Sequence, residues 1–131
     1  MPTISDFNAA SSAETDREHE VQLELLRALC TAAGENRDAA VVGEILDRLI
    51  AYSEAHFMSE ELLMRLKSYD DYEDHVDDHV QMLDTLRTIA ARHAAGDSTL
   101  IAGGATDALA FIRNHIATRD RRFADYVRNN L

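Results

Sequence analysis

Three pairs of side chains in this sequence combine the residue types and the spacing of metal ligands: His56 with Glu60, His75 with His79, and His115 with Asp120. In the first two pairs the partners are four residues apart. On a helix such partners lie one turn apart on the same face, so both can reach one metal ion. A single pair of this kind is a weak signal, because similar pairs also occur on solvated surfaces. The three pairs gain meaning only if the fold brings them together.

The elements that would carry these pairs are helices. Apolar residues recur with a helical period along nearly the whole chain, which predicts an all-α protein. Polar breaks divide the chain into helices from Thr15 to Gly34, from about 38 to 67, from the acidic run at 70–74 to Gly96, and from either 97 or the glycine pair 103–104 onward. Short connections favour an up-down-up-down antiparallel four-helix bundle.

The start of the first helix is predicted from a capping-box pattern. Thr15 is followed three residues later by Glu18, an arrangement that satisfies free N–H groups of a first turn. Residues 1–14 carry no strong pattern. We therefore expect an N-terminal arm over residues 1–14 and a bundle domain over residues 15–131.

The order of the helices predicts that the three pairs meet. The pair on the second helix lies near its C-terminal end, the pair on the third near its N-terminal end, and the pair on the fourth near its C-terminal end. In an alternating bundle these ends lie at the same end of the molecule. The first helix would contribute from its N-terminal part, where His19 lies on the inward stripe. Seven metal-competent side chains from four helices are thus expected at one level of the core.

Steps of three and four residues predict which side of each helix faces inward. On the first helix the predicted stripe is His19, Leu23, Leu26, Cys30 and Ala33, and on the second it is Ile45, Leu49, Tyr52, His56, Glu60 and Leu63. The third helix carries His93 on its stripe, 14 residues past His79 and so about 21 Å along the axis. We expect His93 to be a polar residue at the far end of the bundle and not a ligand.

The spacing of His115 and Asp120 is unusual for a helical ligand pair. Five residues place two side chains about 140° apart on an ideal helix. Asp120 would reach the site only if the helix is locally distorted, or if its carboxylate bridges two metal ions.

The size and chemistry of the set indicate two metal ions. Structural zinc sites usually take four ligands, and seven are present. Five imidazoles and two carboxylates suit iron, whereas softer metals prefer thiolates. Bridging carboxylates would hold two ions about 3.5–4 Å apart. With one oxo or hydroxo bridge, two six-coordinate iron ions would keep one open position for a small ligand.

The combined set resembles the ligand pattern of the hemerythrins, over a stretch from about 16 to 126. The resemblance implies the following roles: His75, His79 and His115 bind one iron, His19 and His56 bind the other, and Glu60 and Asp120 bridge the two. It also implies dioxygen binding at the open position of the two-histidine iron, beside an apolar ligand pocket formed by Phe57, Phe111, Ile112 and Ile116.

The donor set favours reversible dioxygen binding, for carriage or storage, over oxidation chemistry. Carboxylate-rich di-iron oxidases of the four-helix class use more anionic ligands, which stabilise high-valent iron, whereas five neutral imidazoles favour the ferrous state. The chain is therefore not expected to be an enzyme. Three alternatives remain open: a sensor of dioxygen or nitric oxide that signals through a separate partner, a di-iron enzyme that consumes peroxide or nitric oxide, and a metal-free interaction bundle.

Composition limits the partners. A formal net charge of −11 argues against nucleic acid and against anionic lipid surfaces. No stretch approaches the ~18–20 uncharged apolar residues of a membrane span, and the N-terminus lacks the features of a signal peptide. The single cysteine suits a reducing compartment. We expect a cytoplasmic protein whose partner is dioxygen; the sequence is compatible with a monomer and does not define the oligomeric state.

Overall fold

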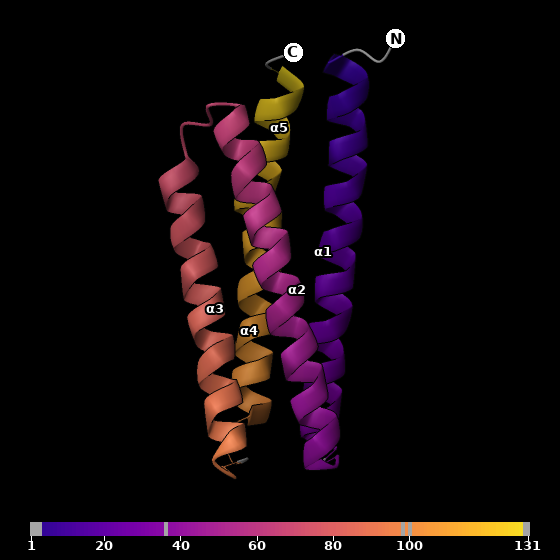
Figure 1. Cartoon of the computed structure of the whole chain (residues 1–131), viewed down its shortest axis with the longest axis vertical. Coiled ribbons are helices and arrows are strands. Elements are labelled where there is room, and N and C mark those ends of the chain that lie inside the picture. Colours follow the sequence, from indigo (N-terminus) through magenta and orange to yellow (C-terminus); the bar gives the residue numbers. More distant parts are fainter. Residues whose placement is uncertain (1–3, 36, 98, 100, 130–131) are drawn as a thin grey trace.

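The computed structural model describes residues 4–35, 37–97, 99 and 101–129, with side chains from residue 13 onward. The chain forms α1 (Ile4–Gly34), α2 (Ala39–Leu66), α3 (Tyr72–Ala94), α4 (Ile101–His115), a π-helical turn η1 (Ile116–Asp120) and α5 (Arg121–Asn129). The last three elements follow one another without a break and form one rod (Figure 1). The described residues contain no strand, so the predicted all-α class is confirmed.

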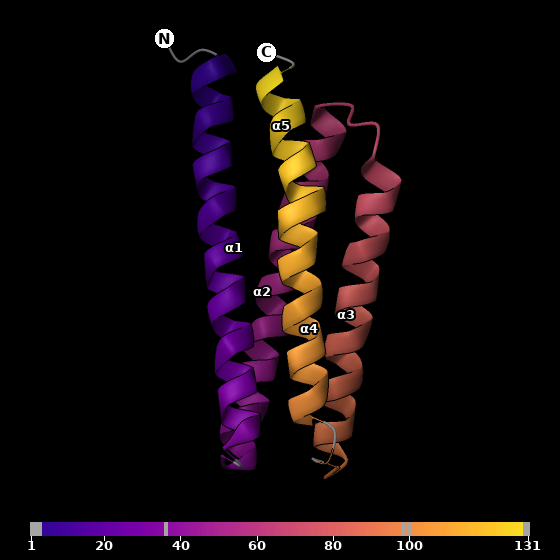
Figure 2. The same cartoon turned by 180° about the vertical axis from the view of Figure 1, so that it is seen from behind.

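The four long rods form an up-down-up-down bundle, as predicted. Both termini and the α2–α3 connection lie at one end, and the α1–α2 and α3–α4 connections lie at the other (Figures 1 and 2). Each of α1 and α3 packs against both α2 and α4. Among the described residues, no helix is long and apolar enough to cross a membrane.

The predicted start of the first helix at Thr15 is wrong. α1 begins at Ile4, so residues 4–14, which were expected to form an arm, are helical. Between Ile4 and Gly34 the chain has neither proline nor glycine, and nothing in this stretch interrupts a helix. Residues 1–3 lie outside the described part. The division into an arm and a bundle domain stays a prediction, because helix bounds alone do not define a domain.

The other helix ends follow local chemistry. The Asp38 carboxylate accepts a hydrogen bond from the Ala40 N–H at 3.1 Å and so caps the start of α2. Gly96 has a φ of +83°, a conformation that glycine adopts without strain, directly after α3. α4 begins at Ile101, between the two starts expected from the sequence. Its Gly104 lies where a Cβ would come within 3.2 Å of Ile89, so the glycine allows α3 and α4 to approach closely.

The predicted inward stripes of α1 and α2 are displaced by one residue over part of their length. On α1, Gln22, Leu29 and Ala32 are buried, while Leu23, Cys30 and Ala33 are only half-buried. On α2, Leu46, Ser53 and Met64 are buried in place of Ile45, Tyr52 and Leu63. Burial on α1 follows steps of three, four, three and three residues from His19, whereas the predicted stripe began with a step of four. Mixed steps of three and four are typical of helices that pack at small angles.

Two apolar clusters of unequal size fill the bundle. The larger spans all four rods, and the smaller joins Met64, Tyr69 and Phe123 near the α2–α3 connection. Along α2, Glu60 lies between Phe57 of the larger cluster and Met64 of the smaller one. The predicted site residues therefore occupy a polar layer with apolar packing above and below it.

Candidate metal centre

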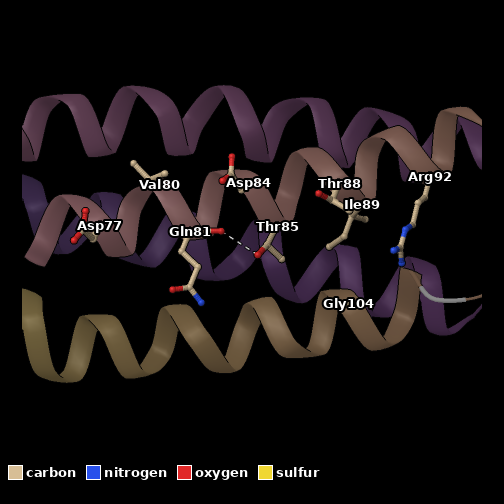
Figure 3. A pocket seen from close by; sticks show the side chains of 9 residues that line it. All are labelled: Asp77, Val80, Gln81, Asp84, Thr85, Thr88, Ile89, Arg92 and Gly104. Carbon is tan, nitrogen blue, oxygen red and sulfur yellow. Dashed lines mark hydrogen bonds between the residues drawn. The ribbon is translucent and has the colours of Figure 1, made fainter.

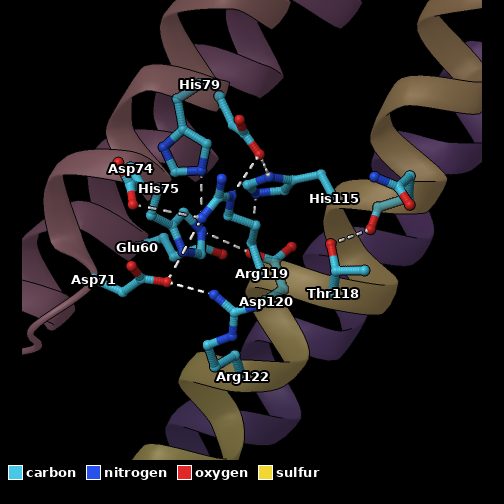
Figure 4. Close-up of polar contacts among 12 residues, drawn as sticks. Glu60, Asp71, Asp74, His75, His79, His115, Thr118, Arg119, Asp120 and Arg122 are labelled. Carbon is cyan, nitrogen blue, oxygen red and sulfur yellow. Dashed lines mark hydrogen bonds and ion pairs between the residues drawn. The ribbon is translucent and has the colours of Figure 1, made fainter.

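The structure brings all seven predicted ligands together. One group, whose potential ligand atoms lie within 4.8 Å of one another, comprises Glu60, His75, His79, His115 and Asp120; a second comprises His19, His56 and Glu60. All seven side chains are buried. Figure 4 shows the first group between α3 and the end of α4. Four helical rods thus contribute to one compact centre that could hold metal ions.

A π-helical turn resolves the awkward five-residue spacing. Residues 116–120 form η1, in which hydrogen bonds run from i to i+5. This wider turn brings residues five apart onto the same side of the helix. His115 Nε2 consequently lies 3.1 Å from an oxygen of Asp120. Of the two explanations that the sequence left open for Asp120, a local distortion of the helix is present.

The Glu60 carboxylate lies between two sets of imidazoles. Its Oε1 atom is 2.5 Å from His75 Nε2 and 3.1 Å from His79 Nε2. Its Oε2 atom is 3.5 Å from the Nε2 atoms of both His19 and His56. One oxygen of this carboxylate therefore faces each set.

The Asp120 carboxylate is divided in the same way. Its Oδ1 atom is 2.8 Å from His75 Nε2 and 3.1 Å from His115 Nε2, and its Oδ2 atom is 2.9 Å from His19 Nε2. The centre thus has a three-histidine half with five inward donor atoms and a two-histidine half with four. Each carboxylate offers one oxygen to each half.

Three outer carboxylates hold the far nitrogens of the rings. Contacts from Nδ1 run from His56 to Glu18 at 3.1 Å, from His79 to Glu61 at 2.8 Å and from His115 to Asp78 at 2.9 Å. A carboxylate at Nδ1 keeps the proton there and leaves the Nε2 lone pair free for a metal. Asp78 also accepts a hydrogen bond from Arg119 Nε at 3.1 Å. These three rings are therefore held in an orientation that suits metal ligation.

Several potential ligand atoms at the centre have no hydrogen-bond partner. The buried atoms without a hydrogen-bond partner include Nε2 of His19, His79 and His115, Oε2 of Glu60 and both carboxylate oxygens of Asp120. These atoms lie close to one another, but their angles do not suit hydrogen bonds. Buried polar atoms are rarely left unpaired, because each costs free energy. Lone pairs directed at a common point fit bound metal ions.

Opposite charges partly balance the centre when no metal is bound. Burial lowers the pKa of His19, but the Asp120 and Glu60 carboxylates close to its Nε2 atom outweigh burial and raise the pKa to about 10. His75 has the same opposing influences, and its pKa rises to about 9. Burial raises the pKa of each carboxyl, yet the imidazoles hold both carboxyl pKa values below their usual range. Metal ions must therefore displace protons from the imidazoles.

The four residues expected to form the ligand pocket lie in or against the larger apolar cluster. Phe57 and Ile112 are buried, and Phe111 and Ile116 are half-buried. The Phe57 ring stacks on the His79 ring with centroids 4.0 Å apart and planes at 8°. Apolar side chains thus adjoin the centre, and their role as a ligand pocket stays a prediction.

His93 and a surface groove lie apart from the centre. His93 Nε2 donates to the Ala39 carbonyl at 2.8 Å, near the opposite end of α2, and belongs to neither group of potential ligands. The groove runs along α3 and α4 (Figure 3), and its lining residues are Asp77, Val80, Gln81, Asp84, Thr85, Thr88, Ile89, Arg92 and Gly104. None of these is one of the seven.

Sequence reasoning missed the residues that support the ligands. The outer carboxylates had no distinguishing spacing, because acidic residues are common throughout this chain. A buried polar pair, Gln22 with Ser53, was also missed. The sequence spacing could have predicted this pair, because Gln22 is three residues after His19 and Ser53 is three residues before His56.

Comparisons with known proteins agree with this geometry. One relative is "Myohemerythrin" from Theromyzon tessulatum, 35% identical over 54 residues that cover 41% of this chain and 45% of that protein. The chain thus aligns with less than half of that relative. A solved structure described only as that of a leucine-to-phenylalanine mutant has the same fold, with a TM-score of 0.80, 23% identity and coverage of 88% of this chain and 87% of that one.

The family comparison covers most of the chain. The family model described as "Hemerythrin HHE cation binding domain" matches residues 11–127, a range that includes all seven clustered side chains. The chain therefore belongs to the hemerythrin family of cation-binding domains.

Proposed function

We propose that this protein binds dioxygen reversibly at a di-iron centre, as a carrier or store. The observation that carries the proposal is the division of both carboxylates between the two halves. One oxygen of Glu60 and one of Asp120 face the three-histidine half, and the other oxygens face the two-histidine half. A carboxylate divided in this way can bridge two metal ions.

The proposed ligand roles follow this division. His75, His79 and His115 would hold one iron, His19 and His56 would hold the other, and Glu60 and Asp120 would bridge them. Two iron ions bound there would supply two electrons and one open coordination position for a small ligand. The shortfall of one protein donor in the two-histidine half supports an open position on that side.

The surrounding residues would fix the chemistry at binding. Glu18, Glu61 and Asp78 hold the Nδ1 protons of His56, His79 and His115, so these three imidazoles stay in one tautomer and one orientation. Apolar clusters above and below the layer keep bulk water away from the centre. Five imidazoles against two carboxylates favour the ferrous state, which supports reversible binding over oxidation of a substrate.

The test is the visible and near-ultraviolet spectrum of the reduced, iron-loaded protein. Charge-transfer bands should appear when oxygen is admitted and disappear when it is removed. Bands that persist after oxygen removal would contradict reversible binding and favour a redox enzyme or a one-way sensor. If the protein binds no iron, the proposal is wrong.

A further inference from the structure

A buried polar pair lies one helical turn from the two ligands of the two-histidine half. Gln22 on α1 is one turn after His19, and Ser53 on α2 is one turn before His56. Because α1 and α2 are antiparallel, both residues lie one turn from the centre toward the larger apolar cluster. Gln22 Nε2 donates to Ser53 Oγ at 2.9 Å, and both residues are fully buried.

One atom of this pair has no partner. The amide oxygen of Gln22 is buried without a hydrogen bond. Leaving a buried amide oxygen unpaired destabilises a protein, so native structures usually supply a donor from the protein or from an ordered water. The amide nitrogen of Gln22 already donates a hydrogen bond to Ser53. The amide oxygen is therefore left to accept a hydrogen bond from another group.

The three-histidine half is built differently at the same level. The residue one turn past His79 is Met82, and Ile112 lies one turn before His115; both are buried and apolar. Apolar side chains are therefore sufficient to fill this level of the bundle. The polar pair is confined to the half that has one donor atom fewer.

We propose that Gln22 and Ser53 form a small-ligand subsite that accepts a hydrogen bond from an O–H group beside His19 and His56. In the resting protein the occupant is a water molecule. Ser53 orients the amide, and the Gln22 oxygen accepts a hydrogen bond from the O–H group of the ligand. Among ligands of the oxidised protein, the subsite favours those that carry an O–H group over anions that carry none. This inference rests on the di-iron assignment made above.

The test compares azide binding to the oxidised, iron-loaded protein and its variants, followed by visible absorption. Azide binds as an anion without a proton, so it must displace a water that Gln22 stabilises. Gln22→Leu keeps the side-chain size but removes the acceptor, and it should tighten azide binding about fivefold to tenfold. Ser53→Ala should act in the same direction with a smaller effect. Met82→Leu, at the matching level of the other half, should change affinity by less than about twofold.

Each outcome separates this proposal from the di-iron assignment. Iron content is measured first, and a wild-type protein without iron would overturn both. Two irons per chain with unchanged azide affinity in Gln22→Leu and Ser53→Ala would overturn the subsite alone, whatever happens to the melting temperature. Weaker azide binding in Gln22→Leu would show that Gln22 donates, which also overturns the subsite. If Gln22→Leu does not fold, Ser53→Ala carries the test.

Discussion

The two halves of the centre differ in how completely their polar atoms are used. In the three-histidine half, three imidazoles and two carboxylate oxygens surround one position, and apolar side chains lie one turn further into the core. In the two-histidine half, two imidazoles and two oxygens surround the other, and one turn further into the core lies Gln22, whose buried amide oxygen has no hydrogen-bond partner. This difference supports the proposal that the first half holds a metal alone and the second holds a metal together with an exchangeable small ligand.

Removing the carboxylate of Glu60 should have the largest effect on iron binding, because its two oxygens belong to different halves. Glu60 approaches four of the five histidines. Glu60→Gln keeps the shape but removes the charge that balances the imidazoles, so iron content should fall from two per chain to near zero by elemental analysis. Glu44→Gln, the same change at an exposed position of α2, is the control. Two irons retained in Glu60→Gln would contradict the bridging role.

Removing one ligand from the two-histidine half should reduce iron binding in that half alone. His56→Ala leaves the two-histidine half with three donor atoms, against five in the three-histidine half. We therefore expect about one iron per chain, held by the three-histidine half. Elemental analysis and the loss of the oxygen-dependent bands would report this. His93→Ala should keep both irons. Complete loss of iron from His56→Ala would show that the two halves bind iron only together. That result would contradict the expectation that the three-histidine half holds iron by itself.

The outer carboxylates should have smaller and separable effects. Asp78→Asn weakens the hold on His115 and also disturbs Arg119, so metal affinity should fall about 10–100-fold in the three-histidine half. Glu18→Gln should weaken the two-histidine half through His56. Competition with a chelator measures both. Glu54→Gln, which alters only an ion pair with Arg87, should leave affinity unchanged. Equal metal affinities in all three variants would show that the outer carboxylates do not strengthen metal binding by the imidazoles.

Proton competition should give the smallest and most gradual effect. The pKa values of His19 and His75 are raised to about 10 and about 9 in the metal-free fold, above the unfolded value of 6.5. Their stabilising contribution is complete below pH 6.5 and is lost as pH rises through 9 and 10. The free energy of unfolding of the metal-free protein should thus fall over this window, while metal affinity rises. Denaturant titrations between pH 6.5 and 9.5 measure the first trend; a flat or rising profile would contradict it.

Much of the centre could be predicted from the sequence because helical spacing and bundle topology are regular. The four-residue step and the alternation of helix direction were enough to predict that four of the ligands lie together: His56, Glu60, His75 and His79. The π-helical turn itself was not predicted, because the five-residue spacing of His115 and Asp120 was compatible either with a local distortion of the helix or with a bridging carboxylate. Its position between 116 and 120 depends on tertiary packing.

The supporting polar residues could not be predicted in the same way. Gln22 and Ser53 were assigned to no stripe, because neighbouring Leu23 and Tyr52 are larger and more apolar. Burial on α1 and α2 is set by the geometry of helix packing and not by the most apolar choice at each step. The start of α1 at Ile4 was missed because a capping pattern at Thr15 can also occur within a helix.

The most direct test of the two-half centre is anomalous diffraction at the iron edge from crystals of the iron-loaded protein. We predict two peaks about 3.5–4 Å apart. One should lie among His75, His79 and His115 and the other beside His19 and His56, with a carboxylate of Glu60 or Asp120 between them. A single peak shared by all five imidazoles, or peaks outside this layer, would contradict the account.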